Sequence, residues 1–452
     1  MRRRRVVQQG LGMAAALASA AFGCRQERSA ALPAGDVVST DGLVIGAGLA
    51  GLACAQRLRA AGRRVLVLEA RQRLGGRIWT EHRQGRAIEL GASWLHGIDN
   101  NPLHRLMTRE LGLSLLASSD RNRLTIDPAG RRWTPARTSQ AEAWLASQVQ
   151  RAEQQGSPDQ ALSRWLPARL SPDQRFTLIA DVVHELGAEL KAIAADAPLG
   201  DGQVLLGGDA LVPAGLDQLV RHLAQGLEIR CAEPVRQIQH GPQGVQVITA
   251  TGLICRARQL CCTVPLGVLK AGAITFDPPL PLAKQRAIAG LGMGLLDKIV
   301  LTFPRRFWEG EGWIRNDGPV PGLWSEWLDL TPLLGRPALM GFNAADTARR
   351  LARQPDAALV ASAIEQLQRC FPQAEIPVPS DVLRSSWGED PYAMGSYSFP
   401  AVGFAEAAGL RQELARPWGA LVLAGEAASA AFPATLHGAY LSGRQAAESL
   451  LG

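Results

Sequence analysis

Residues 41–70, DGLVIGAGLAGLACAQRLRAAGRRVLVLEA, constrain the fold more than any other part of the chain. A short apolar stretch at residues 43–45 runs into a glycine-rich turn, and an amphipathic helical segment follows the turn. A second apolar stretch at residues 65–68 ends on Glu69. Strand, turn, helix and strand in this order predict a parallel βαβ unit of the Rossmann type.

The glycines of the turn have the GxGxxG spacing of a dinucleotide-binding fingerprint. Gly46 allows the tight turn, Gly48 lets a pyrophosphate approach the backbone, and Gly51 lets the helix pack closely on the strand. The helix N-terminus attracts the phosphates. Glu69 follows about twenty residues on, where a carboxylate accepts hydrogen bonds from a ribose diol. This segment therefore predicts a dinucleotide site.

A second glycine pair with an arginine, Gly75-Gly76-Arg77, follows shortly after Glu69. It resembles a segment of FAD-dependent oxidoreductases of the amine oxidase kind, in which the pair and its arginine meet the same pyrophosphate. The chemistry agrees, because the planar guanidinium of arginine is a donor suited to phosphate. A surface ion pair is the alternative for Arg77. The resemblance implies FAD as the cofactor.

Further motifs extend this resemblance over nearly the whole chain after residue 40. IELGASWLHG (88–97) resembles the segment that passes over the flavin in polyamine oxidases, and PAGLDQLV (213–220) with EPVRQI (233–238) resembles the return to the nucleotide domain. The remaining motifs are CTVPLGVLKAGAITFDPPLPLAKQRAI (262–288), GLGMGLLDKIVLTFPRRFW (290–308) and LVLAGEAASAAFPATLHGAYLSGRQAA (421–447). Together they are similar to flavin amine oxidases of the branch that contains polyamine oxidases and lysine-specific histone demethylases.

The resemblance implies an α/β fold: a Rossmann-type, GR2-like FAD-binding domain with an inserted α+β substrate-binding domain. The length of 452 residues also favours two domains. The predicted divisions are an export signal and linker at 1–40, an FAD-binding domain from 41–98, 203–288 and 383–452, and a substrate-binding domain from 99–202 and 289–382.

The resemblance also implies which residues contact FAD. They are Gly46, Ala47, Gly48, Gly51, Glu69, Ala70, Arg71, Gly76, Arg77, Ser93, Trp94, Val235, Trp387, Gly425, Glu426 and Leu436. Val235 matches the residue whose backbone meets the adenine, and Glu426 matches an acid beside the ribityl–pyrophosphate region. Ser396 occupies the position at which monoamine oxidases of the mitochondrial type have a cysteine bonded to the flavin. Non-covalent FAD is therefore expected.

Lys298 lies in GMGLLDKIVLTF (292–303), a β-branched run typical of a buried strand. Only four of the 48 basic residues are lysines, so where a positive charge alone is needed this sequence would be expected to have arginine. An ammonium pushed toward a cofactor cavity is desolvated and its pKa falls, and lysine changes protonation state there whereas arginine stays charged. The resemblance implies that Lys298 hydrogen-bonds through a water to N5 of the flavin. Snorkelling from a strand edge is the alternative.

Three further residues are expected at the amine. Tyr397 resembles one wall of the aromatic slot that orients the amine, with ordinary core packing as the alternative. Thr435 aligns with the opposite wall, as in the histone demethylase branch, so the slot is half aromatic and aryl monoamines are less expected. His96 resembles a histidine that several polyamine oxidases keep near the amine, where it can accept a proton near neutral pH; a structural histidine is the alternative. Glu185 and Glu189 lie four apart on one helix face, as contacts for a second ammonium or as a solvated face.

The predicted function is FAD-dependent amine oxidation. Hydride passes from the carbon next to the amine nitrogen to flavin N5, the imine is hydrolysed to an aldehyde or ketone and an amine, and O2 or a redox protein is the acceptor. A polyamine or another secondary amine is the expected substrate. The alternatives are an alkaloid or nicotine-type amine dehydrogenase with a cytochrome acceptor, a desaturase-like or protoporphyrinogen-oxidase-like flavoenzyme, an L-amino acid oxidase, and a flavin-binding scaffold without activity.

The net charge of +7 depends largely on Arg2–Arg5, and no basic cluster elsewhere argues for nucleic-acid binding. Those arginines precede a mildly apolar Ala- and Gly-rich run, which resembles a twin-arginine export signal. A periplasmic or exported protein is therefore expected, with Cys24 as a candidate lipid anchor; a misassigned start or a basic tail is the alternative. No later stretch has the length of a membrane span, and none of the seven cysteines has a metal-ligand spacing.

Overall fold

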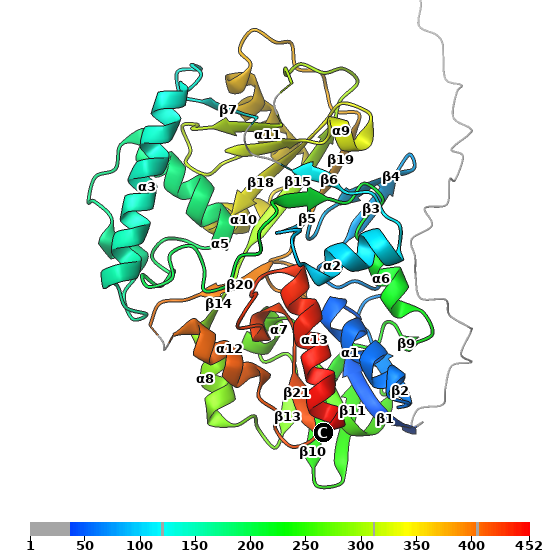
Figure 1. Ribbon diagram of the computed structural model, residues 1–452. Helices are drawn as coiled ribbons and strands as arrows, with labels where there is room; N and C mark the ends of the chain where they lie inside the picture. Colours follow the sequence, from blue (N-terminus) through cyan, green and yellow to red (C-terminus); the bar gives the residue numbers. More distant parts are fainter. Residues whose placement is uncertain (1–36, 119–121, 311, 404–405) are drawn as a thin grey trace, which may run out of the picture.

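The protein is described by a computed structural model, which covers residues 37–118, 122–310, 312–403 and 406–452. The predicted export signal, with Arg2–Arg5 and Cys24, lies outside these residues. Two lobes are visible in Figure 1, one around α1, α13 and β1 and the other around β15 and β18. Within the described ranges, no helix combines the length and the apolar character that crossing a membrane requires.

The predicted βαβ unit is present as β1 (Val37–Ile45), α1 (Leu49–Ala60) and β2 (Val65–Leu68), with β1 and β2 parallel. A Cβ on Gly51 would lie 1.9 Å from the Gly46 carbonyl oxygen, so only glycine permits this close packing of helix on turn. β1 begins before the predicted domain start at residue 41, because residues 37–40 pair with residues 254–257 of the neighbouring strand.

The larger sheet has eight strands in the order β13-β10-β11-β12-β1-β2-β9, with β21 also paired to β12. Besides β1 and β2, its strands are β9 (Glu228–Arg230), β10 (Val235–Gly241), β11 (Gly244–Thr249), β12 (Ile254–Cys262), β13 (Thr275–Asp277) and β21 (Leu421–Leu423). β1 therefore lies between two parallel partners, β2 and β12, and its residues Leu43, Val44 and Ile45 are buried on both faces.

The second sheet has six strands in the order β19-β15-β18-β17-β16-β7. They are β7 (Arg123–Ile126), β15 (Leu296–Thr302), β16 (Trp313–Asn316), β17 (Glu326–Asp329), β18 (Ala338–Ala344) and β19 (Asp381–Arg384). β15, which contains Lys298, has β18 on one side and β19 on the other, so Lys298 does not lie at a strand edge. The predicted domain boundary at residue 383 falls inside β19; the division into domains remains a prediction.

Three small sheets connect the lobes. They pair β14 (Leu291–Gly294) with β20 (Tyr397–Pro400), β3 (Thr80–Arg83) with β4 (Arg86–Glu89), and β8 (Asp209–Leu211) with β5 (Trp94–Leu95) and β6 (Leu116–Ser118). Through these pairs, segments far apart in sequence reach the region between the two large sheets.

Helices cover the sheets. The longer ones are α3 (Pro135–Gln155), α6 (Asp217–Ala224), α8 (Leu282–Gly290), α10 (Ala345–Ala352), α11 (Asp356–Cys370), α12 (Ala407–Ala415) and α13 (Leu436–Leu451). The shorter ones are α2 (Pro102–Arg105), α4 (Pro172–Leu178), α5 (His184–Leu186), α7 (Leu266–Lys270) and α9 (Thr331–Leu334), with π-helical turns η1 (Leu106–Glu110) and η3 (Ile179–Val183) and 3-10 turns η2 (Leu162–Trp165) and η4 (Glu426–Ala428). α13 lies along α1 (Figure 1).

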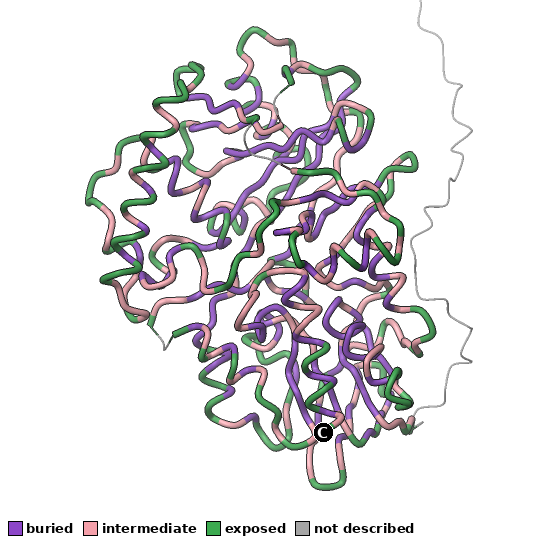
Figure 2. The backbone as a smooth tube through the Cα atoms, viewed as in Figure 1, coloured by how far each residue is buried: buried purple, intermediate pink, exposed green. Residues whose placement is uncertain are grey.

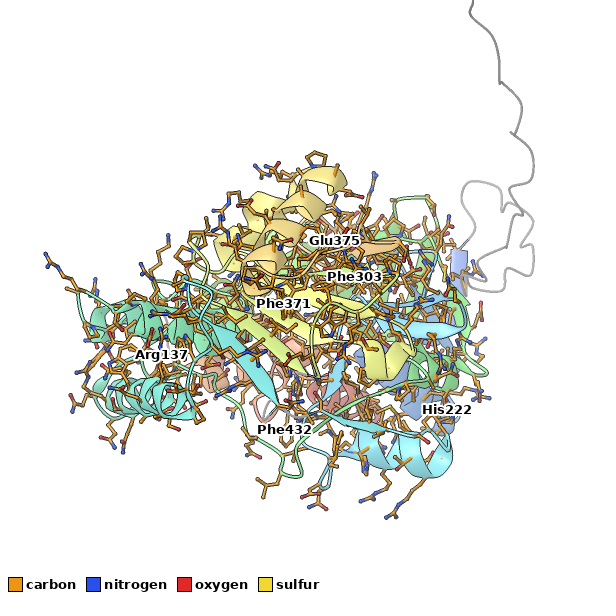
Figure 3. All side chains as sticks on the ribbon, turned by 90° about the horizontal axis from the view of Figure 1, so that it is seen from above. Arg137, His222, Phe303, Phe371, Glu375 and Phe432 are labelled. Atoms are coloured by element: carbon orange, nitrogen blue, oxygen red, sulfur yellow. The ribbon has the colours of Figure 1, made fainter. Side chains whose placement is uncertain are left out.

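Burial follows the sheets: the purple segments of Figure 2 run mainly through the strands, and exposed segments lie mainly on helices and loops. Phe303 and Phe371, labelled in Figure 3, belong to the cluster that joins α11 to the six-stranded sheet. Ile299 and Leu301 lie in that cluster, whereas Val300 lies in another on the opposite face, as the alternation along β15 predicts.

Candidate active site

One cavity of about 860 Å³ is lined by residues of both lobes. Every residue predicted for the cofactor or the amine lines it except Ala47, Gly51 and Glu189, which is described below. Ala47 and Gly51 act from behind its wall: Gly51 packs α1 on the turn, and the backbone N–H of Ala47 donates to Glu69. The fold thus brings positions 46 to 436 to a single site.

Glu69 is fixed at the end of β2. Its two carboxylate oxygens accept hydrogen bonds from the backbone N–H groups of Ala47 (2.8 Å) and Arg71 (2.9 Å). The guanidinium of Arg71 donates to Asp390 at 2.6 Å and lies over the ring of Tyr392. The carboxylate therefore has a defined orientation in the cavity wall, as recognition of a ribose diol requires.

Gly48 shows whether this end of the cavity fits a dinucleotide. Its φ of −79° is ordinary, and a Cβ there would meet no protein atom closer than the Gly75 carbonyl oxygen at 3.8 Å. Neither backbone strain nor packing within the protein requires glycine at this position. What a Cβ would fill is the space in front of the α1 N-terminus, where a pyrophosphate binds in such folds. The residues present therefore fit the cofactor.

Arg77 and Glu426 form one charged unit in the cavity wall. Arg77 Nη1 donates to Glu426 Oε1 at 2.8 Å and to the Ser396 carbonyl oxygen at 2.9 Å. Burial raises the pKa of Glu426, but Arg77, the Ser398 hydroxyl and Arg411 lower it more, so its pKa lies below the ordinary value. The side chain of Arg77 is only 22% exposed, so its ion pair lies in the wall and not on the outer surface.

Arg411 was not found by sequence reasoning, and it is fully buried behind this wall. It makes a two-point ion pair with Asp201, at 2.6 and 2.9 Å, and donates to the Ser398 hydroxyl at 2.7 Å. Ser398 in turn donates to Glu426 at 2.6 Å. Asp201 and Arg411 are 210 positions apart and neither belongs to a motif, so no sequence signal pointed to this pair.

Lys298 is buried and lines the cavity. Its Nζ donates to the Ser93 hydroxyl at 2.6 Å, to the Gly91 carbonyl oxygen and, at 3.5 Å, to the Glu89 carbonyl oxygen, and it lies over the ring of Trp94. Burial lowers the pKa of Lys298 to about 8, although Glu89 and Asp297 act in the opposite direction. The side chain is therefore able to exchange a proton near neutral pH.

Lysine replaces arginine at two other positions of this arginine-rich chain, and there it serves contacts with backbone carbonyl groups. Lys270 donates to three backbone carbonyl oxygens, those of Ile288, Ala289 and Leu291, and Lys284 donates to those of Glu413 and Leu414. Both lie away from the cavity. Lys270, Lys284 and Lys298 thus each place a compact ammonium among backbone carbonyl groups, and of these three only Lys298 lies in the cavity wall.

Tyr397 and Thr435, the two residues predicted as walls for the amine, both line the cavity. The Tyr397 hydroxyl donates to the His184 carbonyl oxygen at 2.8 Å, and burial raises its pKa well above the usual range. Thr435 is the N-cap of α13: its hydroxyl accepts from the Gly438 N–H at 3.0 Å and donates to the Phe432 carbonyl oxygen at 2.9 Å. The Thr435 hydroxyl is thus engaged by backbone, which leaves the residue a wall rather than a hydrogen-bonding group.

His96 faces a carboxylate at the cavity. Its Nδ1 lies 3.0 Å from Asp209, and half of its side chain is exposed. Desolvation lowers the pKa of His96, but the hydrogen bond to Asp209 and the charges of Asp209 and Glu185 raise it more, so the pKa is above the ordinary value. His96 is therefore paired with the Asp209 carboxylate, a contact that sequence reasoning did not foresee.

Glu185 and Glu189 have different places. Glu185 lines the cavity, close enough to His96, Asp209 and Tyr397 for their charges to interact, and burial raises its pKa. Glu189 does not line the cavity and accepts a hydrogen bond from the Asp346 N–H at 3.2 Å. Glu185 lies in α5, and α5 ends at the left-handed Gly187. Glu189 therefore does not share a helix face with Glu185, and the expected four-residue pair is not formed.

Within the described ranges, no group of three or more His, Cys, Asp or Glu residues is arranged to bind a metal ion. Cys54, Cys255, Cys261, Cys262 and Cys370 are buried and free.

Comparison with known proteins adds an independent line of evidence. Residues 49–132 and 114–451 match the family of flavin containing amine oxidoreductases. Polyamine oxidase 2 of Arabidopsis thaliana is 34% identical over 431 residues, which cover 90% of this chain and 87% of that protein. Polyamine oxidase 4 of Oryza sativa subsp. japonica is 34% identical with the same coverage. Lysine-specific histone demethylase 1 homolog 1 of the same plant is 33% identical, but the match covers 52% of it.

Among solved structures, wild-type putrescine oxidase bound to putrescine superposes with a TM-score of 0.75 at 22% identity, over 92% of this chain and 100% of that one. A triple mutant of putrescine oxidase gives a TM-score of 0.76 at 22% identity. At this identity the similarity shows the shared fold.

Proposed function

The chain belongs to the family of flavin-containing amine oxidoreductases and is an FAD-dependent amine oxidase, and from this premise we propose that its substrate is a polyamine or another secondary amine with a second positive charge. Bound FAD supplies the hydride acceptor for the carbon next to the amine nitrogen. The desaturase-like and scaffold alternatives are not favoured by the family to which the chain belongs.

The observation that carries the substrate proposal is the pair of carboxylates at the amine side of the cavity. Glu185 and Asp209 both line it, and their charges act on His96 between them. Carboxylates in a partly desolvated cavity attract an ammonium more strongly than they do in water. An amine placed beside Tyr397 would therefore find a partner for a second ammonium. The names of the two polyamine oxidases support the same class.

Within this proposal each side chain has a physical task. Tyr397 and Thr435 form the walls that orient the reacting amine, and Trp387, whose Nε1 donates to the Leu90 carbonyl oxygen at 3.0 Å, closes the cavity and excludes water. Lys298 holds or releases a proton at Nζ, because its pKa of about 8 leaves both forms accessible.

We also propose O2 as the acceptor, with hydrogen peroxide as product and a redox protein as the alternative. Export by a twin-arginine-type signal, with Cys24 as a candidate lipid anchor, is supported by the sequence of residues 1–24 alone.

An anaerobic panel of amines, followed by loss of flavin absorbance, tests the substrate proposal. The panel contains a polyamine, an acetylated polyamine, a diamine, a monoamine of equal chain length and an alkaloid secondary amine. We expect rapid bleaching by the polyamine and the diamine and slow bleaching by the monoamine. Equal rates for the monoamine, or bleaching by the alkaloid amine alone, would contradict the proposal. Repeating the run with O2 or a c-type cytochrome identifies the acceptor.

A further inference from the structure

Beneath the amine side of the cavity lies a buried series of charged residues that the reaction itself does not use. We infer that this series, the Arg315 network (Asp181, Arg315, Glu326 and His184), is a positioning device that sets the preference for amines with a second charge. The inference rests on the proposed function, because it concerns how Glu185 and Tyr397 are presented to such an amine.

The network is continuous and well shielded from water. Arg315 donates to Asp181 at 2.7 Å and to Glu326 at 2.8 Å, and the other oxygen of Glu326 lies 2.6 Å from His184 Nδ1. The side chains of Arg315, Glu326 and His184 are 15%, 8% and 6% exposed. One arginine does not neutralise both carboxylates, so a negative charge remains beside the His184 imidazole. The Nδ1–H group of His184 therefore donates a hydrogen bond to Glu326.

The network anchors a segment that has little rigidity of its own. His184 begins α5, which is only three residues long, between the π-helical turn η3 and Gly187 in the left-handed region (φ 62°). So short a helix gains little stability from its own hydrogen bonds, and π-helical turns often occur at functional sites. A Cβ on Gly187 would lie 2.7 Å from the Leu295 N atom, so this end of α5 also depends on its neighbours.

Two cavity features depend on where this segment lies. The carbonyl oxygen of His184 accepts the hydrogen bond from the Tyr397 hydroxyl at 2.8 Å, and the next residue, Glu185, lines the cavity. A shift of α5 therefore moves the acidic contact and the aromatic wall together. Asp209 is held separately, by His96 and the Gly97 N–H. The network thus fixes the joint position of Glu185 and Tyr397 relative to the second acidic contact, Asp209.

The test uses the holoenzyme and compares a diamine with a monoamine of equal chain length. Glu326→Gln keeps the shape of the side chain and removes the charge that holds His184. The matched control is Asp329→Asn on the same strand β17, since Asp329 is also buried and paired with an arginine, Arg306, but its side chain bonds Arg306 and the Thr331 N–H and not His184. We expect the diamine-to-monoamine ratio of kcat/KM to fall about 10-fold in Glu326→Gln, mainly through the KM of the diamine, and to stay unchanged in the control.

His184 variants separate positioning from proton transfer. His184→Gln retains an N–H donor for Glu326 and is expected to keep most of the ratio, whereas His184→Ala is expected to lose it. Equal loss in both variants would assign proton transfer to the imidazole and overturn the positioning role. Asp181→Asn is a milder variant, because Asp181 is the most exposed member of the network, and we expect a smaller loss in the same direction.

The outcomes for the two proposals differ. A ratio within 2-fold of wild type in Glu326→Gln, His184→Ala and Asp181→Asn, with normal FAD content and melting temperature, would overturn the inference while leaving the proposed function intact. A wild-type enzyme that does not prefer the diamine would overturn the substrate class instead.

Discussion

The Nζ of Lys298 lies 2.6 Å from the hydroxyl of Ser93, although the two residues are 205 positions apart. Both line the cavity that also holds the glycine-rich turn and Tyr397. The contact joins the six-stranded sheet to the segment after β4, and so fixes the distance between the lysine and the nucleotide lobe. A protonatable group is thereby held at one point of the cavity wall.

Because Gly48 serves the cofactor and not the packing of the protein, its substitution should change FAD binding and leave the stability of the apoprotein unchanged. Gly48→Ala adds a methyl group to open space, so the apoprotein should melt at the wild-type temperature while the affinity for FAD falls at least about 10-fold. Gly51→Ala is the matched comparison, because its Cβ would lie 1.9 Å from the Gly46 carbonyl oxygen and should destabilise the apoprotein itself. Flavin titration and thermal melts measure both; unchanged FAD affinity in Gly48→Ala would contradict the assignment.

Glu185 and Glu189 form a natural test pair. Glu185→Gln should raise the KM for a diamine about 10-fold and leave that for a monoamine unchanged, since it removes one charge from the cavity wall. Glu189→Gln changes a glutamate outside the cavity and should leave both constants as they are. Steady-state kinetics with the two substrates decide. A similar rise in the KM for the diamine in both variants would mean that the Glu185 charge acts on the substrate only at long range.

Glu89 predicts a pH dependence of stability. Burial raises its pKa from 4.5 to about 7, so its contribution to stability is complete below pH 4.5 and is lost as the pH rises through about 7. The loss amounts to about 3 kcal/mol. Glu89→Gln removes it, so between about pH 4.5 and 7, the window set by these two pKa values, the melting temperature of wild type should fall relative to the variant. Parallel pH curves for the two proteins would refute the assignment.

Ser396 predicts that the flavin is held without a covalent bond. Its hydroxyl is engaged by the backbone of Leu296, as acceptor from the N–H and donor to the carbonyl oxygen, both at 2.9 Å. After acid denaturation and centrifugation, all the flavin absorbance is expected in the supernatant. A yellow pellet that survives washing would show a covalent link.

The local parts of this structure could be predicted from sequence, and the reason is physical. The GxGxxG turn, its helix and Glu69 act within one βαβ unit, where spacing along the chain determines position in space. Residues 65–68 form β2, and the helical segment expected after the turn is α1. The Lys298 strand was found because its β-branched alternation is itself a local signal.

The parts that sequence missed depend on contacts between distant segments. Arg411 with Asp201, and His184 with Glu326, are ordinary residues whose partners lie 210 and 142 positions away. Glu185 and Glu189 were expected on one helix face, but α5 ends at the left-handed Gly187 between them, which the four-residue spacing alone did not reveal. Apart from Ala47 and Gly51, the site residues named from resemblance line the cavity, and their roles remain predictions until the variants are measured.

Lys298→Met provides the most direct test of the central claim, that the Lys298 ammonium acts on the reaction from the cavity wall. Lys270→Met is the control, because Lys270 also donates to backbone carbonyl oxygens but lies outside this cavity. Stopped-flow absorbance follows flavin reduction by an amine and reoxidation by O2 in each protein, with FAD content measured alongside. We expect Lys298→Met to bind FAD but to slow at least one half-reaction about 100-fold and to lose the inflection near pH 8, with Lys270→Met like wild type. Wild-type rates in both half-reactions of Lys298→Met would contradict the account.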